Sequence, residues 1–159
     1  MNLYIVDINF DITDNIKYPN IYNEYINIDK KKKKIISYLL KKYISNKDIV
    51  YKNDKPYFKD SDLFFNISHG KDCVVLITDN NEIGIDIMPN DLDITKYEIL
   101  HNKTISDWCI MESYFKSTLD NKEFTEFQIN NHTCVICSKF KKHITLHKLF
   151  STDLIFFTK

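Results

Sequence analysis

The apolar residues of this chain fall into short stretches with two different periods. The first stretch, residues 2–8 (NLYIVDI), is rich in β-branched and aromatic side chains and predicts a strand. Similar stretches predict further strands at residues 63–68, 73–78, 83–87, 126–129, 133–138 and 143–149. The segments between several of them carry the Asn, Asp, Gly or Pro typical of turns: 53–56, 69–72, 79–81 and 88–91.

Two other stretches show the three-to-four-residue spacing of an amphipathic helix. The first begins at Asp29, a candidate N-cap, and its apolar positions are Ile35, Ile36, Leu39, Leu40, Tyr43 and Ile44. The second covers residues 104–119, and its apolar positions are Ile105, Trp108, Met111, Phe115 and Leu119. We expect both stripes to face a core. Residues 11–28 predict an irregular or partly helical connection.

The order of these elements is strand, helix, strands, and then again strand, helix, strands. This order predicts an α+β fold built as a pseudo-twofold pair of similar lobes, each with one helix packed on a small, mainly antiparallel sheet. We place the N-terminal lobe at residues 1–80 and the C-terminal lobe at residues 81–159. A chain of 159 residues is long enough for two lobes that share a core, but short for two independent domains.

Charge and composition limit the kind of partner. The 22 basic residues balance the 22 acidic residues, so the formal net charge is zero. This balance argues against binding of nucleic acid or membrane through bulk electrostatics, and any anion site must be local. Because the sequence contains no Arg, such a site must use Lys or His, and Lys contacts phosphate as a point charge without the fork geometry of Arg.

Four cysteines each lie in an apolar segment: Cys73, Cys109, Cys134 and Cys137. No long uncharged apolar run precedes them, and we expect a reduced protein in the cytoplasm. Cys134 and Cys137 form a CxxC pair, but a zinc site would need a second pair of ligands at metal spacing. Among the histidines, only His143 and His147 are four residues apart, and they lie in a predicted strand. An iron or zinc protein that uses His and Cys is therefore a minor alternative.

Three sets of polar side chains lie where an apolar core would not require them. Asp86 stands among β-branched residues, where a carboxylate is costly to bury unless it is paired or binds a cation. The alternative is an Asp that caps a turn. His69 precedes a glycine that would let a ligand approach closely, although a lone His is more often structural. Glu112 and Lys116 share a face of the second predicted helix, a spacing that equally suits a surface ion pair.

The run of lysines from Lys30 to Lys34 opens the first predicted helix. Such a run is most often a solvated helical face. A helix N-terminus already favours anions, so five lysines there are unfavourable unless negative charge arrives from elsewhere. The other interpretation is therefore an anion-binding rim.

Taken together, these residues resemble one enzyme family. The sequences FNISHG at residues 65–70, GIDI at 84–87 and WCIMESYFK at 108–116 resemble, in the same order, the motifs FNISHS, GIDIE and W..KES..K of the Sfp-type 4′-phosphopantetheinyl transferases. The segment 55–57 (KPY) is similar to the family's GKP segment. The opening LYIV is similar to its first strand, and CVICS and HITLHKL are similar to its last two, so the resemblance covers most of the chain.

This resemblance implies a Mg²⁺-dependent holo-[acyl-carrier-protein] synthase, with Mn²⁺ as an alternative ion. Such an enzyme moves the phosphopantetheine arm of coenzyme A to a serine of an apo acyl or peptidyl carrier protein and releases 3′,5′-ADP. By motif match, Asp86 and Glu112 would bind the metal, Glu112 would also take the serine proton, and Lys116 would stabilise the leaving phosphate. The residues expected at the coenzyme A phosphates are Lys55, Ser68, His69, Lys31 and Lys34. We expect a monomer.

The chain also departs from the family pattern. Met88 stands where the bacterial pattern has a second carboxylate, and some members with Met there use water instead. Met111 replaces the Lys before the helix Glu. The segment between the second and third motifs is short, and residues 117–120 (STLD) replace a Gly-rich segment. The main alternative is therefore a degenerate member that binds coenzyme A or a carrier protein without transfer, although the retained carboxylates and Lys116 argue against it.

Overall fold

The computed structural model describes residues 1–9, 16–97, 103–120, 122–150 and 153–154, and the structural statements below concern these residues. Their elements form a mixed α+β fold, as predicted. In chain order they are β1 (Asn2–Asp7), η1 (Asn20–Glu24), α1 (Ile28–Ile44), β2 (Ile49–Lys52), β3 (Lys55–Phe58), β4 (Phe64–His69), β5 (Cys73–Asp79), β6 (Ile83–Pro89), η2 (Ile94–Lys96), α2 (Ile105–Ser117), β7 (Glu123–Ile129), β8 (His132–Ser138) and β9 (Thr145–Leu149). None of the described helices is long and apolar enough to cross a membrane.

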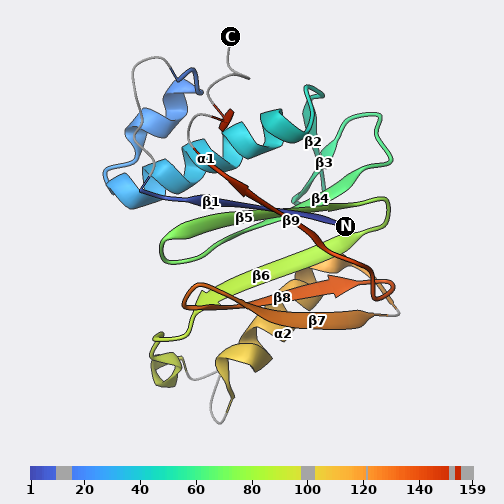
Figure 1. The fold of residues 1–159 in the computed structure, drawn as a ribbon. Helices are drawn as coiled ribbons and strands as arrows, with labels where there is room; N and C mark the ends of the chain where they lie inside the picture. Colours follow the sequence, from blue (N-terminus) through green and yellow to red (C-terminus); the bar gives the residue numbers. More distant parts are fainter. Residues whose placement is uncertain (10–15, 98–102, 121, 151–152, 155–159) are drawn as a thin grey trace.

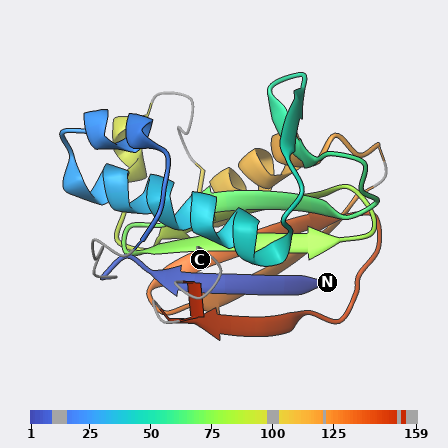
Figure 2. The same ribbon diagram turned by 90° about the horizontal axis from the view of Figure 1, so that it is seen from above.

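The strands form two main sheets that lie between the two helices. The first sheet has the order β4-β5-β1-β9 and is antiparallel except for the parallel pair β1 and β9. The second has the order β6-β8-β7 and is antiparallel throughout. Helix α1 covers the outer side of the first sheet and α2 that of the second (Figure 1). The β2–β3 hairpin is a separate ladder that projects beyond the C-terminal end of α1 (Figure 2).

The layers follow from the alternation of side chains along the strands, since successive residues of a strand point to opposite faces. In β5, Val74 and Leu76 pack in the core beneath α1, whereas Val75 and Ile77 pack between the two sheets. All seven residues of β5 are buried, which explains its uninterrupted apolar run. The molecule therefore has two cores, one beneath α1 and one between the sheets.

Helix α1 buries the stripe that its sequence predicts. Its buried apolar residues are Ile35, Ile36, Leu39 and Leu40. The expected cap is wrong, however, because Asn27 and not Asp29 caps the helix. The Asn27 side chain accepts a hydrogen bond from the Lys30 N–H at 2.8 Å, and Asp29 lies in the first turn, where a carboxylate favours the helix dipole.

Helix α2 packs through a different face from the predicted one. Cys109, Ser113 and Ser117 are its buried residues, whereas Phe115 is 68% exposed. The cause lies in β6, where a Cβ atom on Gly84 would lie well inside contact distance of the Ser113 carbonyl oxygen. The helix backbone rests directly on the strand, and only small side chains fit between them.

Two further differences concern the ends of strands. Asn53 and Asp54 form the β2–β3 turn with φ of 50° and 60°, and Lys55, expected within this turn, is the first residue of β3. The strand expected at residues 143–149 forms as β9, but it pairs with β1 and so returns to the first sheet. The division after residue 80 thus separates the two main sheets except for β9.

Candidate functional site

Strands β4 and β6 run side by side where the two sheets meet, and side chains connect them. The side-chain oxygen of Asn66 accepts a hydrogen bond from the Ile85 N–H at 3.1 Å. The hydroxyl of Ser68 donates to Oδ1 of Asp86 at 2.9 Å. Polar residues of the first two motifs therefore form a seam between two apolar sheets, and we call this line of contacts the β4–β6 seam.

Asp86 is a deeply buried charged residue of the seam. It is 5% exposed, and its Oδ1 accepts hydrogen bonds from Ser68 and from Nζ of Lys116, the latter at 2.6 Å. Its Oδ2 is buried and accepts no hydrogen bond from the described residues, although the Cys109 thiol lies close enough to interact with the Asp86 side chain. A buried carboxylate oxygen without a partner is costly. The second oxygen of Asp86 is therefore a position that a cation could fill.

Lys116 extends from the last turn of α2 across the seam. Its Nζ also lies 3.3 Å from Ser68 Oγ and 3.3 Å from the carbonyl oxygen of Ile85. The Lys116 side chain is 28% exposed, against 7% for Asp86. The ammonium group thus neutralises a buried carboxylate and still has access to solvent and to a ligand.

Glu112 lies one helical turn before Lys116 and three residues after Cys109. Residues at these spacings are neighbours on one side of a helix. Both flanking residues reach Asp86: Lys116 through its ion pair, and Cys109 as a near neighbour. Burial, followed by the charge of Asp86, raises the pKa of the Cys109 thiol well above its usual value. Glu112 therefore belongs to the same side of α2, and it is partly exposed.

His69 ends β4, one residue beyond Ser68. Burial of its ring, followed by the positive charges of nearby lysines, lowers the pKa of His69 to about 4, although the residue as a whole is exposed to solvent. In order of their effect these lysines are Lys34, Lys33, Lys116 and Lys41. Four cations thus act electrostatically on a neutral imidazole next to the seam, an arrangement that favours a bound anion.

The hydrogen bonds of Ser37 define which nitrogen of His69 carries the proton. Ser37 Oγ lies 2.6 Å from the carbonyl oxygen of Lys33 and 2.7 Å from Nε2 of His69. A carbonyl only accepts, so the single hydroxyl hydrogen goes to Lys33, and Nε2–H of His69 donates to Ser37. The Nδ1 atom of neutral His69 then holds a lone pair, and it can donate to an anion only after it is protonated.

The structure separates the other predicted phosphate ligands. Lys34 acts on His69, whereas Nζ of Lys31 lies 5.9 Å from the ring centroid of Tyr18. Lys55 is the first residue of β3, and it forms an ion pair at 3.1 Å with Glu82, the residue just before β6. The Lys55 side chain is only 11% exposed. Of the three lysines expected at the phosphates, only Lys34 is thus shown beside His69.

Several residues of the site were not found from the sequence. Ser37 contacts His69, Lys41 acts on its pKa, Cys109 neighbours Asp86, and Glu82 pairs with Lys55. Ser37 carried a usable signal, because it is a polar residue inside the apolar stripe of α1. The others lie too far from their partners in sequence for a pattern to reveal them.

The departures from the family pattern lie at different distances from the seam. Met88 is two residues beyond Asp86 on β6 and so points to the same face of the strand. Met111 instead lines a surface pocket of about 370 Å³ together with Ile110, Tyr114 and Phe124. This pocket does not include Asp86, Glu112 or Lys116. Of the two methionines, only Met88 bears on the seam.

Comparison with known proteins gives no match: no protein-family model matches the chain, and no curated protein matches it. The site itself and the motifs that form it are therefore the basis for assigning a function.

Proposed function

We propose that this protein is a 4′-phosphopantetheinyl transferase, which moves the phosphopantetheine arm of coenzyme A to a serine of a carrier protein. The observation that carries the proposal is the buried Asp86 carboxylate, with one oxygen bound by Ser68 and Lys116 and the other without a hydrogen-bond partner among the residues that the structure describes. Ser68, which binds this carboxylate, is the chain neighbour of His69, and the charges of α1 lysines and of Lys116 act on His69. A cation position next to an anion-binding group suits a pyrophosphate substrate.

The donor set fits a hard divalent cation such as Mg²⁺. Asp86 Oδ2 would supply one buried carboxylate oxygen, and Glu112, one helical turn before Lys116 on α2, would supply a second carboxylate. Mg²⁺ prefers oxygen ligands, needs few protein carboxylates when phosphate and water complete its shell, and when bound would neutralise charge on the pyrophosphate. The thioether of Met88 adds no ligand of this kind.

The lysines and His69 would hold the phosphates of coenzyme A. Lys33, Lys34 and Lys41 belong to α1, and their charges act on His69 at the end of β4. In the free protein these like charges repel one another. A bound phosphate would relieve this repulsion, and a proton on Nδ1 of His69 would then add a hydrogen-bond donor.

Glu112 and Lys116 are assigned to the transfer itself. Partly exposed Glu112 would accept the proton of the incoming serine hydroxyl, directly or through water. Lys116 donates to Asp86 and Ser68 in the free protein, and its exposed side would donate to the phosphate oxygens on which charge develops. The bond between the β-phosphate and the 3′,5′-ADP leaving group breaks as the serine oxygen bonds to phosphorus.

The partners proposed are apo acyl or peptidyl carrier proteins of fatty-acid, polyketide or nonribosomal peptide synthesis, modified in the cytoplasm. The test is the intact mass of a panel of such carriers after incubation with the full chain, coenzyme A and Mg²⁺. We expect a phosphopantetheine-sized gain on at least one carrier. No gain on any, while a known transferase modifies all of them in parallel, would overturn the proposal in favour of a protein that binds without transfer.

A variant pair connects the activity to the site. Lys116→Ala should slow transfer roughly 10²–10³-fold, as loss of one preorganised donor does, while the affinity for coenzyme A falls much less. Lys122→Ala is the matched control, because Lys122 lies beside Tyr114 on the other side of α2. Equal rates for the two variants would contradict the role of Lys116.

A further inference from the structure

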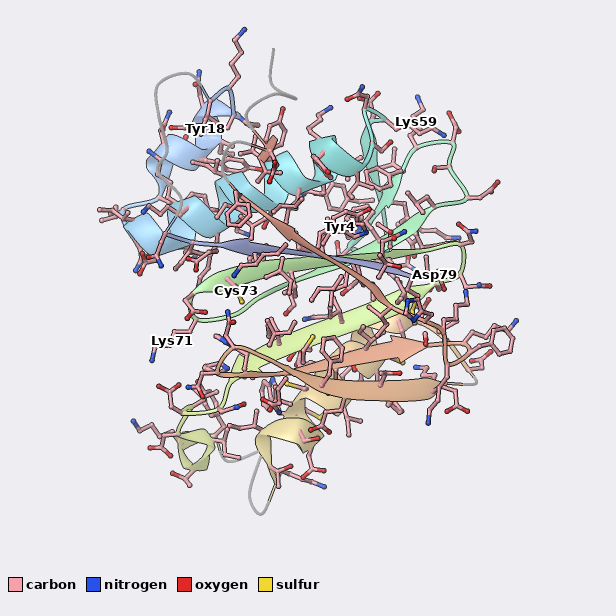
Figure 3. All side chains as sticks on the ribbon, in the orientation of Figure 1. Tyr4, Tyr18, Lys59, Lys71, Cys73 and Asp79 are labelled. Atoms are coloured by element: carbon pink, nitrogen blue, oxygen red, sulfur yellow. The ribbon has the colours of Figure 1, made fainter. Side chains whose placement is uncertain are left out.

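A second cluster of potential metal ligands lies between the two sheets, where the turn that follows His69 meets the start of β8. Asp72 and Cys73 lie at the β4–β5 turn of the first sheet, and His132 begins β8 of the second. One oxygen of Asp72, Sγ of Cys73 and one ring nitrogen of His132 all lie within 4.8 Å of one another. Figure 3 shows Cys73 and Lys71 at the end of β5 that is remote from Asp79.

The geometry of this cluster differs from that of a nucleophilic Cys–His–Asp triad. In a triad, the cysteine and the carboxylate contact opposite nitrogens of the imidazole. Here Asp72 Oδ1 lies 3.4 Å from Nε2 of His132, and the buried Nδ1 atom has no hydrogen-bond partner within the described part of the chain. Burial, followed by the charges of Asp72 and Asp7, also raises the pKa of the Cys73 thiol to about 12. The three groups converge on one point and do not form a relay.

The distance between Asp72 and His132 agrees with that between two ligands of one tetrahedral ion. Two ligands at about 2.0–2.2 Å from zinc lie roughly 3.3–3.6 Å apart at the tetrahedral angle. The separation of 3.4 Å between Asp72 Oδ1 and His132 Nε2 lies within this range. Asp, Cys and His are also the residue types that bind zinc most often.

The surrounding backbone keeps this point open. A Cβ atom on Gly70 would lie 2.9 Å from both Cys73 Sγ and His132 Nε2, so any larger residue would fill the gap between them. The Lys71 N–H donates to Nε2 of His132 at 3.1 Å. Nε2 therefore holds a lone pair in neutral His132, with the proton on Nδ1, and this is the tautomer that ligates a metal through Nε2.

From these observations we infer that Asp72, Cys73 and His132 form a site for a borderline divalent cation of the Zn²⁺ class, which connects the β4–β5 turn to β8. Binding displaces the Lys71 amide from Nε2 and releases the thiol proton of Cys73 to solvent. Water takes the fourth position, reached through the half-exposed side chain of Asp72. The site shares no residue with the proposed Mg²⁺ site and does not depend on it.

Cobalt titration tests this inference, because a thiolate bound to Co²⁺ gives a charge-transfer absorption that oxygen ligands do not give. The full chain, reduced and freed of metal, should bind one equivalent of Co²⁺ with this absorption, and Zn²⁺ should displace it. Cys73→Ser should abolish the absorption, and Asp72→Asn should weaken Co²⁺ binding at least about tenfold. Because the Asp72 side chain is 53% exposed, Asp72→Asn keeps the test decisive even where Cys73→Ser unfolds the chain.

Matched controls test whether the absorption comes from this cluster and not from other thiols or carboxylates of the chain. Cys137→Ser removes another buried thiol, and Asp91→Asn removes a carboxylate that pairs with Lys71 at 2.8 Å, and both should leave the absorption unchanged. Asp86→Asn should also retain it, so failure of the proposed transferase activity would not affect this result. Absence of a thiolate absorption with excess Co²⁺, its survival in Cys73→Ser, or unchanged affinity in Asp72→Asn would overturn the inference.

Discussion

Nζ of Lys116 lies 2.6 Å from Oδ1 of Asp86, and this ion pair joins α2 to β6 at the seam between the two sheets. The Asp86 side chain is 7% exposed and that of Lys116 is 28% exposed. Removing one partner of such a pair leaves a charge that is poorly solvated, which costs much more than removing both. The pair should therefore be strongly coupled in stability as well as in function.

A double-mutant cycle measures this coupling. Asp86→Asn and Lys116→Met, singly and together, should give a coupling free energy of about 1–3 kcal/mol in urea unfolding without metal. The exposed pair Lys71 and Asp91 provides the control, and its coupling should be far smaller because solvent screens both charges. Additive effects of the two substitutions at the seam would show that the ion pair does not hold α2 to β6.

The close approach of α2 to β6 predicts the effect of Gly84→Ala. The new Cβ would meet the carbonyl oxygen of Ser113, which is backbone and cannot rotate away. We expect a loss of about 3 kcal/mol or more in the free energy of unfolding, the upper range for overpacking. Gly70→Ala meets only side-chain atoms and should cost less in the metal-free protein. A change below about 1 kcal/mol for Gly84→Ala would contradict this packing.

The low pKa of His69 predicts a loss of stability in mild acid. The unfolded chain protonates this imidazole near 6.5, whereas the folded chain does so only near 4. Between these two values the unfolded state binds more protons, so the free energy of unfolding falls as the pH falls. The decrease from pH 7 to pH 5, measured by urea unfolding, should be smaller in His69→Asn than in the original chain.

The control for this prediction is His143→Asn, which removes an exposed histidine from the segment before β9. It should show the same decrease between pH 7 and pH 5 as the original chain. An equal decrease in His69→Asn would mean that the lysines and burial do not depress the His69 pKa in solution.

The two lysines that the structure separates give a matched comparison. Lys34→Gln should weaken coenzyme A binding roughly tenfold, about 1.4 kcal/mol, because Lys34 has the largest effect on His69 among the lysines. Lys31 lies one helical turn before Lys34, and its side chain lies near Tyr18. Lys31→Gln therefore removes the same charge but should change the affinity for coenzyme A much less. Calorimetry at fixed salt measures both. An equal loss of coenzyme A affinity in both variants would indicate that the lysines attract the ligand only through their summed charge and that Lys34 contacts no particular phosphate.

Most of the strands and the buried face of α1 could be predicted because they depend on local apolar periodicity, whereas β2 (Ile49–Lys52) was not predicted. The buried face of α2 could not be predicted in this way. Gly84, on a strand about thirty residues earlier in the chain, decides how the helix packs. The same limit applies to the site. The motifs identified Asp86, Glu112 and Lys116 through a resemblance, but neither the bond from His69 to Ser37 nor the approach of His132 to Cys73 has a sequence spacing that would indicate it.

The most direct test of the central claim is the dependence of coenzyme A affinity on Mg²⁺, in the original chain and in Asp86→Asn. If Asp86 binds the cation that contacts the pyrophosphate, Mg²⁺ should tighten coenzyme A binding at least about tenfold in the original chain. This gain should be lost in Asp86→Asn, while Asp91→Asn retains it. A coenzyme A affinity that does not change with Mg²⁺ in the original chain would contradict the account. So would a Mg²⁺-dependent gain in affinity that persists in Asp86→Asn.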